Sequence, residues 1–298
     1  MLSEVIATVR SEGGLRLRGL LTGDEALTTS ELATYDDPGL YGPASSAWRV
    51  HGDMSMLIGG LRALLLQTLH PLAMAGVADH SDYERDPLGR LNRTGRFIGA
   101  TTFGTTESAE QMIALVRRIH TKVEGHTPDG RPYAASDPHL LGWVHATEVD
   151  SFLRAYDRYG TGRLTDAERD RYVAEMAEIG LRLGMEEAPM TVDELAAVLD
   201  DYRAECSYDE QARTAVRFLL APPIPIVTWG PYRVIVAAAI GMLPPWARRM
   251  MYLPLPPGAN SLAIRPAGLV LTRSLGWLMN DGINQDREDR LLLSEVNG

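Results

Sequence analysis

The apolar positions of this chain recur at the spacing of amphipathic helices, and the alternation typical of half-buried strands is nearly absent. We find no hairpin signal in the sequence. Helices are expected over 54–69, 89–100, 108–124, 138–159 and 165–184, from 191 onward, and over 208–220, 234–243 and 266–278. The pattern predicts an all-α fold with a single large helical domain over 1–298. Its core is expected at about 41–220, followed by a proline-rich C-terminal extension at 221–298.

Local signals mark where several of these helices begin and end. Thr165 and Glu168 form a capping-box pattern at a helix start, and Gly184 is typical of a helix end. His70–Pro71 interrupts the helix expected over 54–69, because the residue before a proline avoids helical geometry.

The composition is that of an ordinary globular protein, since 45% of the 298 residues are apolar and 23% are charged. A formal net charge of −10 argues against nucleic-acid binding, which needs a basic face. The single cysteine, Cys206, excludes an intrachain disulfide, and no apolar run approaches the roughly 20 residues of a membrane span. We therefore expect a cytoplasmic protein without an integral membrane span, and a homodimer is left open.

His120 lies on the apolar side of the helix expected over 108–124. The apolar stripe of this helix consists of Met112, Ile113, Val116, Ile119 and Val123. His120 falls inside the stripe, whereas its basic neighbours fall outside it. Two interpretations follow. His120 is either a core histidine bonded to a backbone carbonyl, or a ligand to a metal or to haem iron.

The helix expected over 89–100 has an unusual face, formed by Arg90, Arg93, Thr94 and Phe97 at i, i+3, i+4 and i+7. We expect this face to look inward, where a guanidinium suits a haem propionate, a substrate acid or a reduced oxygen species. The alternative is a solvated basic face.

Two more histidines are candidates for a buried site. His145 and Glu148 lie one turn apart on the helix expected over 138–159. They are either a hydrogen-bonded pair that fixes the helix packing, or a ligand and the group that orients it. His70 is expected either to cap the carbonyl end of the helix before it or to line a cavity.

Several short motifs occur in the order found in a known protein family. They are His70-Pro71, Gly76-Val77, His80-Ser81, Arg90-Leu91-Asn92-Arg93-Thr94, Val116-Arg117-Arg118-Ile119-His120 and Trp143-Val144-His145. On these motifs, residues 41–184 resemble the family that contains the latex-clearing protein, a rubber oxygenase, and the MpaB-type oxygenases. The resemblance implies an all-helical, globin-like core that holds b-type haem.

The resemblance also implies roles for individual residues. His120 matches the family's proximal histidine, the ligand of the iron, while Arg90, Arg93 and Thr94 match its distal, catalytic stretch. Arg93 replaces a lysine that can ligate iron in the rubber oxygenase. Because a guanidinium offers no lone pair, no such sixth ligand is expected here. The region near Met74 has no carboxylate to match the family's distal glutamate.

The sequence thus predicts an oxygenase that depends on b-type haem (iron) and acts with dioxygen on a small apolar, isoprenoid-like substrate, the last by analogy alone. The candidate cofactor-binding residues are His70, Arg90, Phe97, His120 and His145. Two alternatives stay open. One is a haem or lipid carrier without turnover, and the other is a metal-independent helical protein that binds an acidic metabolite.

Overall fold

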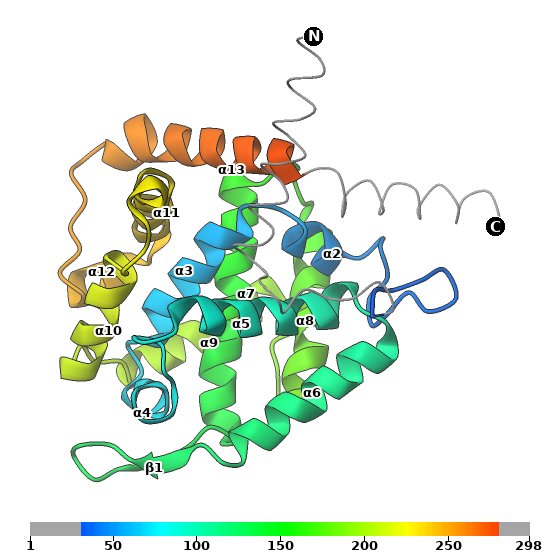
Figure 1. Ribbon diagram of the computed structural model, residues 1–298, viewed down its shortest axis with the longest axis horizontal. Coiled ribbons are helices and arrows are strands. Elements are labelled where there is room, and N and C mark those ends of the chain that lie inside the picture. Colours follow the sequence, from blue (N-terminus) through cyan, green and yellow to red (C-terminus); the bar gives the residue numbers. More distant parts are fainter. Residues whose placement is uncertain (1–30, 280–298) are drawn as a thin grey trace.

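The computed structural model describes residues 31–279, which form an all-α fold with one short β-hairpin (Figure 1). The α-helices are α2 (Ser46–His51), α3 (Met56–Gln67), α4 (Pro71–His80), α5 (Pro87–Phe103), α6 (Thr106–His120), α7 (Pro138–Tyr159), α8 (Asp166–Leu183), α9 (Val192–Asp201), α10 (Glu210–Leu220), α11 (Trp229–Met242), α12 (Pro245–Met250) and α13 (Arg265–Met279). The short 3-10 and π segments are η2 (Tyr202–Ala204), η3 (Ile226–Thr228) and η4 (Asn260–Ile264), and the hairpin strands are β1 (Glu124–His126) and β2 (Pro132–Ala134).

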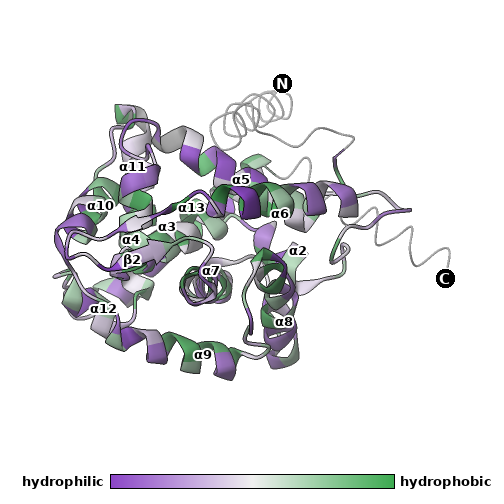
Figure 2. Ribbon diagram, turned by 90° about the horizontal axis from the view of Figure 1, so that it is seen from below, coloured by the Kyte–Doolittle hydropathy of each residue, from purple (hydrophilic) through white to green (hydrophobic). Residues whose placement is uncertain are grey.

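The central element is α7, which passes through the middle of the molecule and is seen end-on in Figure 2 with other helices around it. Its apolar residues are buried on more than one side, including Trp143, Phe152 and Tyr156. A helix that is apolar around most of its circumference is stable only when neighbours cover it, so α7 forms the scaffold on which the rest of the fold is arranged.

The packing of α3 against α7 is close and contains a buried ion pair. A Cβ atom at Gly59 would lie 2.9 Å from the ring of Phe152, so glycine permits this approach. Arg62 is buried in the same interface, where it pairs with Asp150 at 2.8 Å and donates to Ser151 Oγ at 2.6 Å. The charge of Arg62 is therefore compensated inside the protein.

The segment after α10 contributes to the same core. α11 packs on α3, the carbonyl of Met242 accepts a hydrogen bond from Arg62 Nε at 3.0 Å, and Ala238 and Ala239 are fully buried. The part of the predicted proline-rich extension that the structure describes is thus packed into the main helical body.

α5 and α6 form a helical hairpin whose two arms diverge from their connection at 104–105 (Figure 1). α8 packs against α2, α6 and α7. It begins with a complete capping box between Thr165 and Glu168 and ends at Gly184, whose φ of 119° lies in the left-handed region. Each of these signals involves residues close together in sequence, so the sequence alone could predict both ends of α8.

The predicted all-α class is confirmed, and the predicted bounds of the helix over 138–159 agree with α7. The expectation that the chain has no hairpin is wrong. β1 and β2 pair antiparallel, with Gly125 opposite Tyr133, in strands of three residues each that are too short to show alternation. The globin-like character of the core remains a prediction. The two ends of the domain predicted over 1–298 lie outside the described residues.

Among residues 31–279, no single helix is both long and apolar enough to cross a bilayer. α3 and α4 taken together reach the required length and composition, but the chain bends by 105° between them.

Candidate functional site

His120 is the last residue of α6, and its ring has no hydrogen-bond partner in the part of the chain that the structure describes. The Nδ1 atom is buried and unpaired. Desolvation lowers the pKa of His120, so the ring is neutral at pH 7. The interpretation of His120 as a core histidine bonded to a carbonyl is therefore wrong. What the structure offers at this position is a neutral imidazole whose lone pair is available to a ligand.

The arginines of α5 lie in two different environments. Arg90 is partly buried, donates to Ser81 Oγ at 2.8 Å and lies 6.0 Å from the centroid of the Tyr83 ring, and burial lowers its pKa. Arg93 is exposed and pairs with Asp86 at 3.4 Å. The predicted inward face of this helix is therefore only partly inward.

The other two residues of that face are divided in the same way. Thr94 is exposed, and its hydroxyl donates to the carbonyl of Arg90 at 3.1 Å, whereas Phe97 is partly buried. Because α5 diverges from α6 toward its own N-terminus, part of its first turns faces solvent (Figure 1). The catalytic roles of Arg90, Arg93 and Thr94 remain predictions.

His145 and Glu148 lie on the side of α7 that faces α8. A Cβ atom at Gly180 of α8 would lie 3.2 Å from His145 Nδ1, so the two helices approach closely here. His145 Nε2 is buried and has no partner among the described residues, and burial lowers the pKa of His145 to about 4. Burial also raises the pKa of Glu148 to about 7. No hydrogen bond joins the two side chains, so the interpretation of a hydrogen-bonded pair is wrong.

A buried hydrogen-bonded chain lies near this carboxyl group. His51, at the end of α2, has Nδ1 2.7 Å from Thr102 Oγ1 of α5 and Nε2 3.0 Å from the hydroxyl of Tyr172 in α8. Burial lowers the pKa of His51 to about 3 and, together with the charge of Glu148, raises that of Tyr172 well above its usual value. No local sequence pattern predicts these hydrogen bonds, because His51, Thr102 and Tyr172 lie far apart in sequence.

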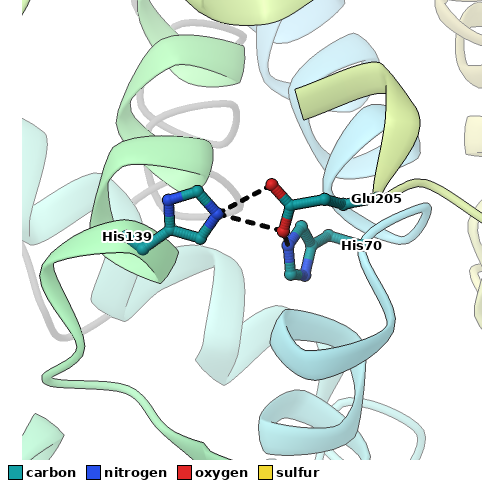
Figure 3. Close-up of side chains that lie close together, drawn as sticks. All are labelled: His70, His139 and Glu205. Carbon is teal, nitrogen blue, oxygen red and sulfur yellow. Dashed lines mark hydrogen bonds and ion pairs between the residues drawn. The ribbon is translucent and has the colours of Figure 1, made fainter. Parts of the chain in front are cut away.

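His70 does not cap the carbonyl end of α3, as one interpretation expected. Its Nδ1 accepts the amide of Ala73 at 3.5 Å and so caps the start of α4. Its Nε2 lies 3.3 Å from Glu205 Oε2, and His139 Nε2 lies 2.8 and 3.0 Å from the two oxygens of the same carboxylate (Figure 3). Neither His139 nor Glu205 was predicted, since 66 positions separate them and no local pattern connects them.

The described residues line two surface clefts, one between the end of α4, the residues before α5, and α10, and the other beside α5. One of about 370 Å³ is lined by Ser81 and Tyr83, which are the neighbours of Arg90. The other, of about 450 Å³, lies between α5 and α6, and its lining includes Ala100 and Met112 but none of the predicted site residues. Clefts of this size hold small ligands.

A family model described as the catalytic domain of the ER-bound oxygenase mpaB/B′ and rubber oxygenase matches residues 48–277. The chain belongs to this family. Neither the search of curated proteins nor that of solved structures returned a match. The resemblance inferred from the motifs over 41–184 is confirmed, and the mpaB/rubber oxygenase match extends it through α13.

Membership in the mpaB/rubber oxygenase family supports oxygenase activity, and with it a substrate and dioxygen as reactants. An oxygenase family also suggests a metal or haem cofactor. Within the described residues, three arrangements have donors suited to iron or a similar ion. Two are the unpaired imidazoles of His120 and His145, and the third is the cluster of His70, His139 and Glu205.

Proposed function

We propose that the chain is an oxygenase that uses b-type haem and acts on a small apolar substrate, with His120 as the protein ligand of the iron. The observation that carries this proposal is the His120 imidazole, which is neutral, has a buried Nδ1 and makes no hydrogen bond to the described residues. Nine buried side-chain atoms of the described residues have no partner, and two of them, in His120 and His145, are imidazole nitrogens, the donor type that binds haem iron.

The residues present fit such a group in two further respects. A neutral histidine is a common axial ligand of haem iron, and haem supplies the activation of dioxygen when it is bound. His145 Nε2 is a second buried donor or acceptor without a partner, which supports a role in cofactor binding. Phe97 is a partly buried ring on α5, suited to apolar contact with a porphyrin edge.

Other side chains supply charge and protons in this proposal. Arg90 presents a partly buried guanidinium that can pair with an anionic group, and Thr94 presents a hydroxyl. Glu148 holds a proton on its carboxyl group up to about pH 7, which suits a general acid at neutral pH. His70 is left out of the haem contacts, because both of its ring nitrogens already have partners.

Titration of the purified full-length chain with haem, followed by absorption spectroscopy before and after dithionite, tests the proposal. We expect one haem per chain with a Soret band. We expect His120→Ala to bind haem about tenfold more weakly or worse, since even outer-shell changes at metal sites cost that much. The matched control is His126→Ala, which changes an exposed histidine of β1.

The absence of a haem spectrum in the wild type would refute the proposal. A normal spectrum and affinity in His120→Ala would refute the ligand assignment. Oxygen-uptake measurements on the haem-loaded chain with small isoprenoid alkenes then separate an oxygenase from the alternative of a haem carrier, which binds the cofactor but consumes no oxygen.

A further inference from the structure

Three potential metal ligands converge at a point where three distant segments of the chain meet. His70 precedes α4, His139 lies in the first turn of α7, and Glu205 follows η2. Each offers one ligand atom, and these atoms all lie within 4.8 Å of one another. Figure 3 shows the Nε2 atoms of both imidazoles directed at the same carboxylate.

The surrounding structure holds the three side chains in this arrangement. The His139 ring lies 4.7 Å from the ring of Tyr202, and the Tyr202 hydroxyl donates to the His139 carbonyl at 2.7 Å. The amide of Ser207 donates to the carbonyl of Leu69 at 2.8 Å, which ties the segment after Glu205 to the residue before His70. The ligand positions are thus fixed by contacts that do not depend on the ligands themselves.

We propose that His70, His139 and Glu205 bind a divalent transition-metal ion, with zinc as the best-fitting ion. In a tetrahedral zinc site the ligand atoms lie about 3.3–3.5 Å apart, as bonds of about 2.0–2.2 Å require. The Glu205 oxygens lie 2.8, 3.0 and 3.3 Å from the Nε2 atoms of the two histidines, and all of the ligand atoms lie within 4.8 Å of one another, so rotations of these three side chains bring them into reach of one ion. Two imidazoles and one carboxylate leave the fourth position for water.

Solvent access favours this binding. His70 is buried, but the side chains of His139 and Glu205 are 54% and 42% exposed, so an ion can enter from solvent.

Metal binding has one local consequence. An imidazole bound through Nε2 carries its remaining proton on Nδ1. In His70 the Nδ1 atom accepts a long hydrogen bond of 3.5 Å from the amide of Ala73. A protonated Nδ1 cannot accept, so metal binding through Nε2 breaks this hydrogen bond. Without a metal, the same three residues form a hydrogen-bonded histidine–carboxylate–histidine cluster, and this is the arrangement against which the proposal is tested.

The test is equilibrium dialysis of the chelator-treated full-length chain against Zn²⁺ at pH 7.5, with metal analysis of the protein. We expect one zinc per chain in the wild type and none in His139→Ala or Glu205→Gln at the same free zinc concentration. With Co²⁺ in place of zinc, we expect the visible absorption of tetrahedral cobalt in the wild type and its loss in both variants.

Two controls locate the ion. His126→Ala removes an exposed histidine outside the cluster, and His120→Ala removes the proposed haem ligand; both are expected to keep the zinc. This separates the metal site from the proposed function, because only the proposed haem binding depends on His120. Circular dichroism verifies that the variants are folded, with His139→Gln as a second variant if His139→Ala is not. A wild type that binds no zinc overturns the proposal, as does retention of zinc in folded His139 and Glu205 variants or its loss in His120→Ala.

Discussion

Replacement of the buried carboxyl group by an amide, Glu148→Gln, is predicted to stabilise the protein at alkaline pH and to have little effect in acid. Burial raises the pKa of Glu148 from its ordinary value of 4.5 to about 7, so the folded protein favours the neutral form. Below pH 4.5 both the folded and the unfolded chain are protonated and stability is unaffected. Between pH 4.5 and about 7 only the unfolded chain ionises, and the free energy of unfolding therefore falls as the pH rises.

The size of the effect follows from the same two values. At about 1.4 kcal/mol for each pH unit, the interval from 4.5 to about 7 corresponds to a loss of about 3 kcal/mol that is complete above pH 7. Glutamine has nearly the same shape and does not ionise, so the variant escapes this loss. It should exceed the wild type in stability by about 3 kcal/mol at pH 8 and by less than about 1 kcal/mol at pH 5.

Urea unfolding at pH 5 and pH 8, followed by far-ultraviolet circular dichroism, measures both differences. The matched control is Glu186→Gln, which changes an exposed glutamate and is expected to leave stability unchanged at either pH. If Glu148→Gln gains no more stability at pH 8 than at pH 5, the carboxyl group is not held neutral by burial, and its proposed role as a proton donor near pH 7 fails with it.

Two other substitutions test the packing around the site. Asp150 pairs with the buried Arg62 at 2.8 Å and with Arg154, whose side chain is 56% exposed, at 2.6 Å. Arg62→Met removes the buried partner and is expected to cost about 3–5 kcal/mol in urea unfolding, whereas Arg154→Met should cost about 1 kcal/mol or less. Equal costs would contradict the role of burial. Gly180→Ala brings a methyl group to 2.6 Å from Met185 Sδ and to 3.2 Å from the His145 ring, and it is expected to lower stability by about 1–3 kcal/mol in thermal unfolding. In Gly230→Ala the new methyl meets nothing within 4 Å, so no loss is expected, and a matching loss there would show that the contact is not responsible.

The features that sequence analysis predicted well are those set by neighbours in the chain. The capping box at Thr165 and Glu168 and the left-handed Gly184 act within a few residues, so the bounds of α8 follow from local chemistry. The family could likewise be inferred, because its motifs are short and ordered, and the match over 48–277 confirms it.

The features that escaped prediction depend on contacts between distant segments. His51 meets Tyr172 across 121 positions, and His139 meets Glu205 across 66, and no periodicity encodes either contact. Helical phase placed His120 on a buried apolar stripe of α6, but the structure has His120 half-buried and Ile119 of the same stripe 50% exposed, and phase could not show that the ring lacks a partner. The prediction that Arg93 points inward was wrong. Helical phase shows on which side of a helix a residue lies, but it does not show whether another element covers that side.

The hydrogen bond from Arg62 to the carbonyl of Met242 has a practical consequence for anyone who shortens this protein. A truncation after Leu220 would remove α11, strip an acceptor from a buried guanidinium and uncover the apolar surface of α3. Such a fragment would keep the Arg62–Asp150 ion pair, but it would leave one buried N–H of Arg62 without an acceptor and expose an apolar surface that favours aggregation. The smallest catalytic unit that can be expressed should therefore reach through α13.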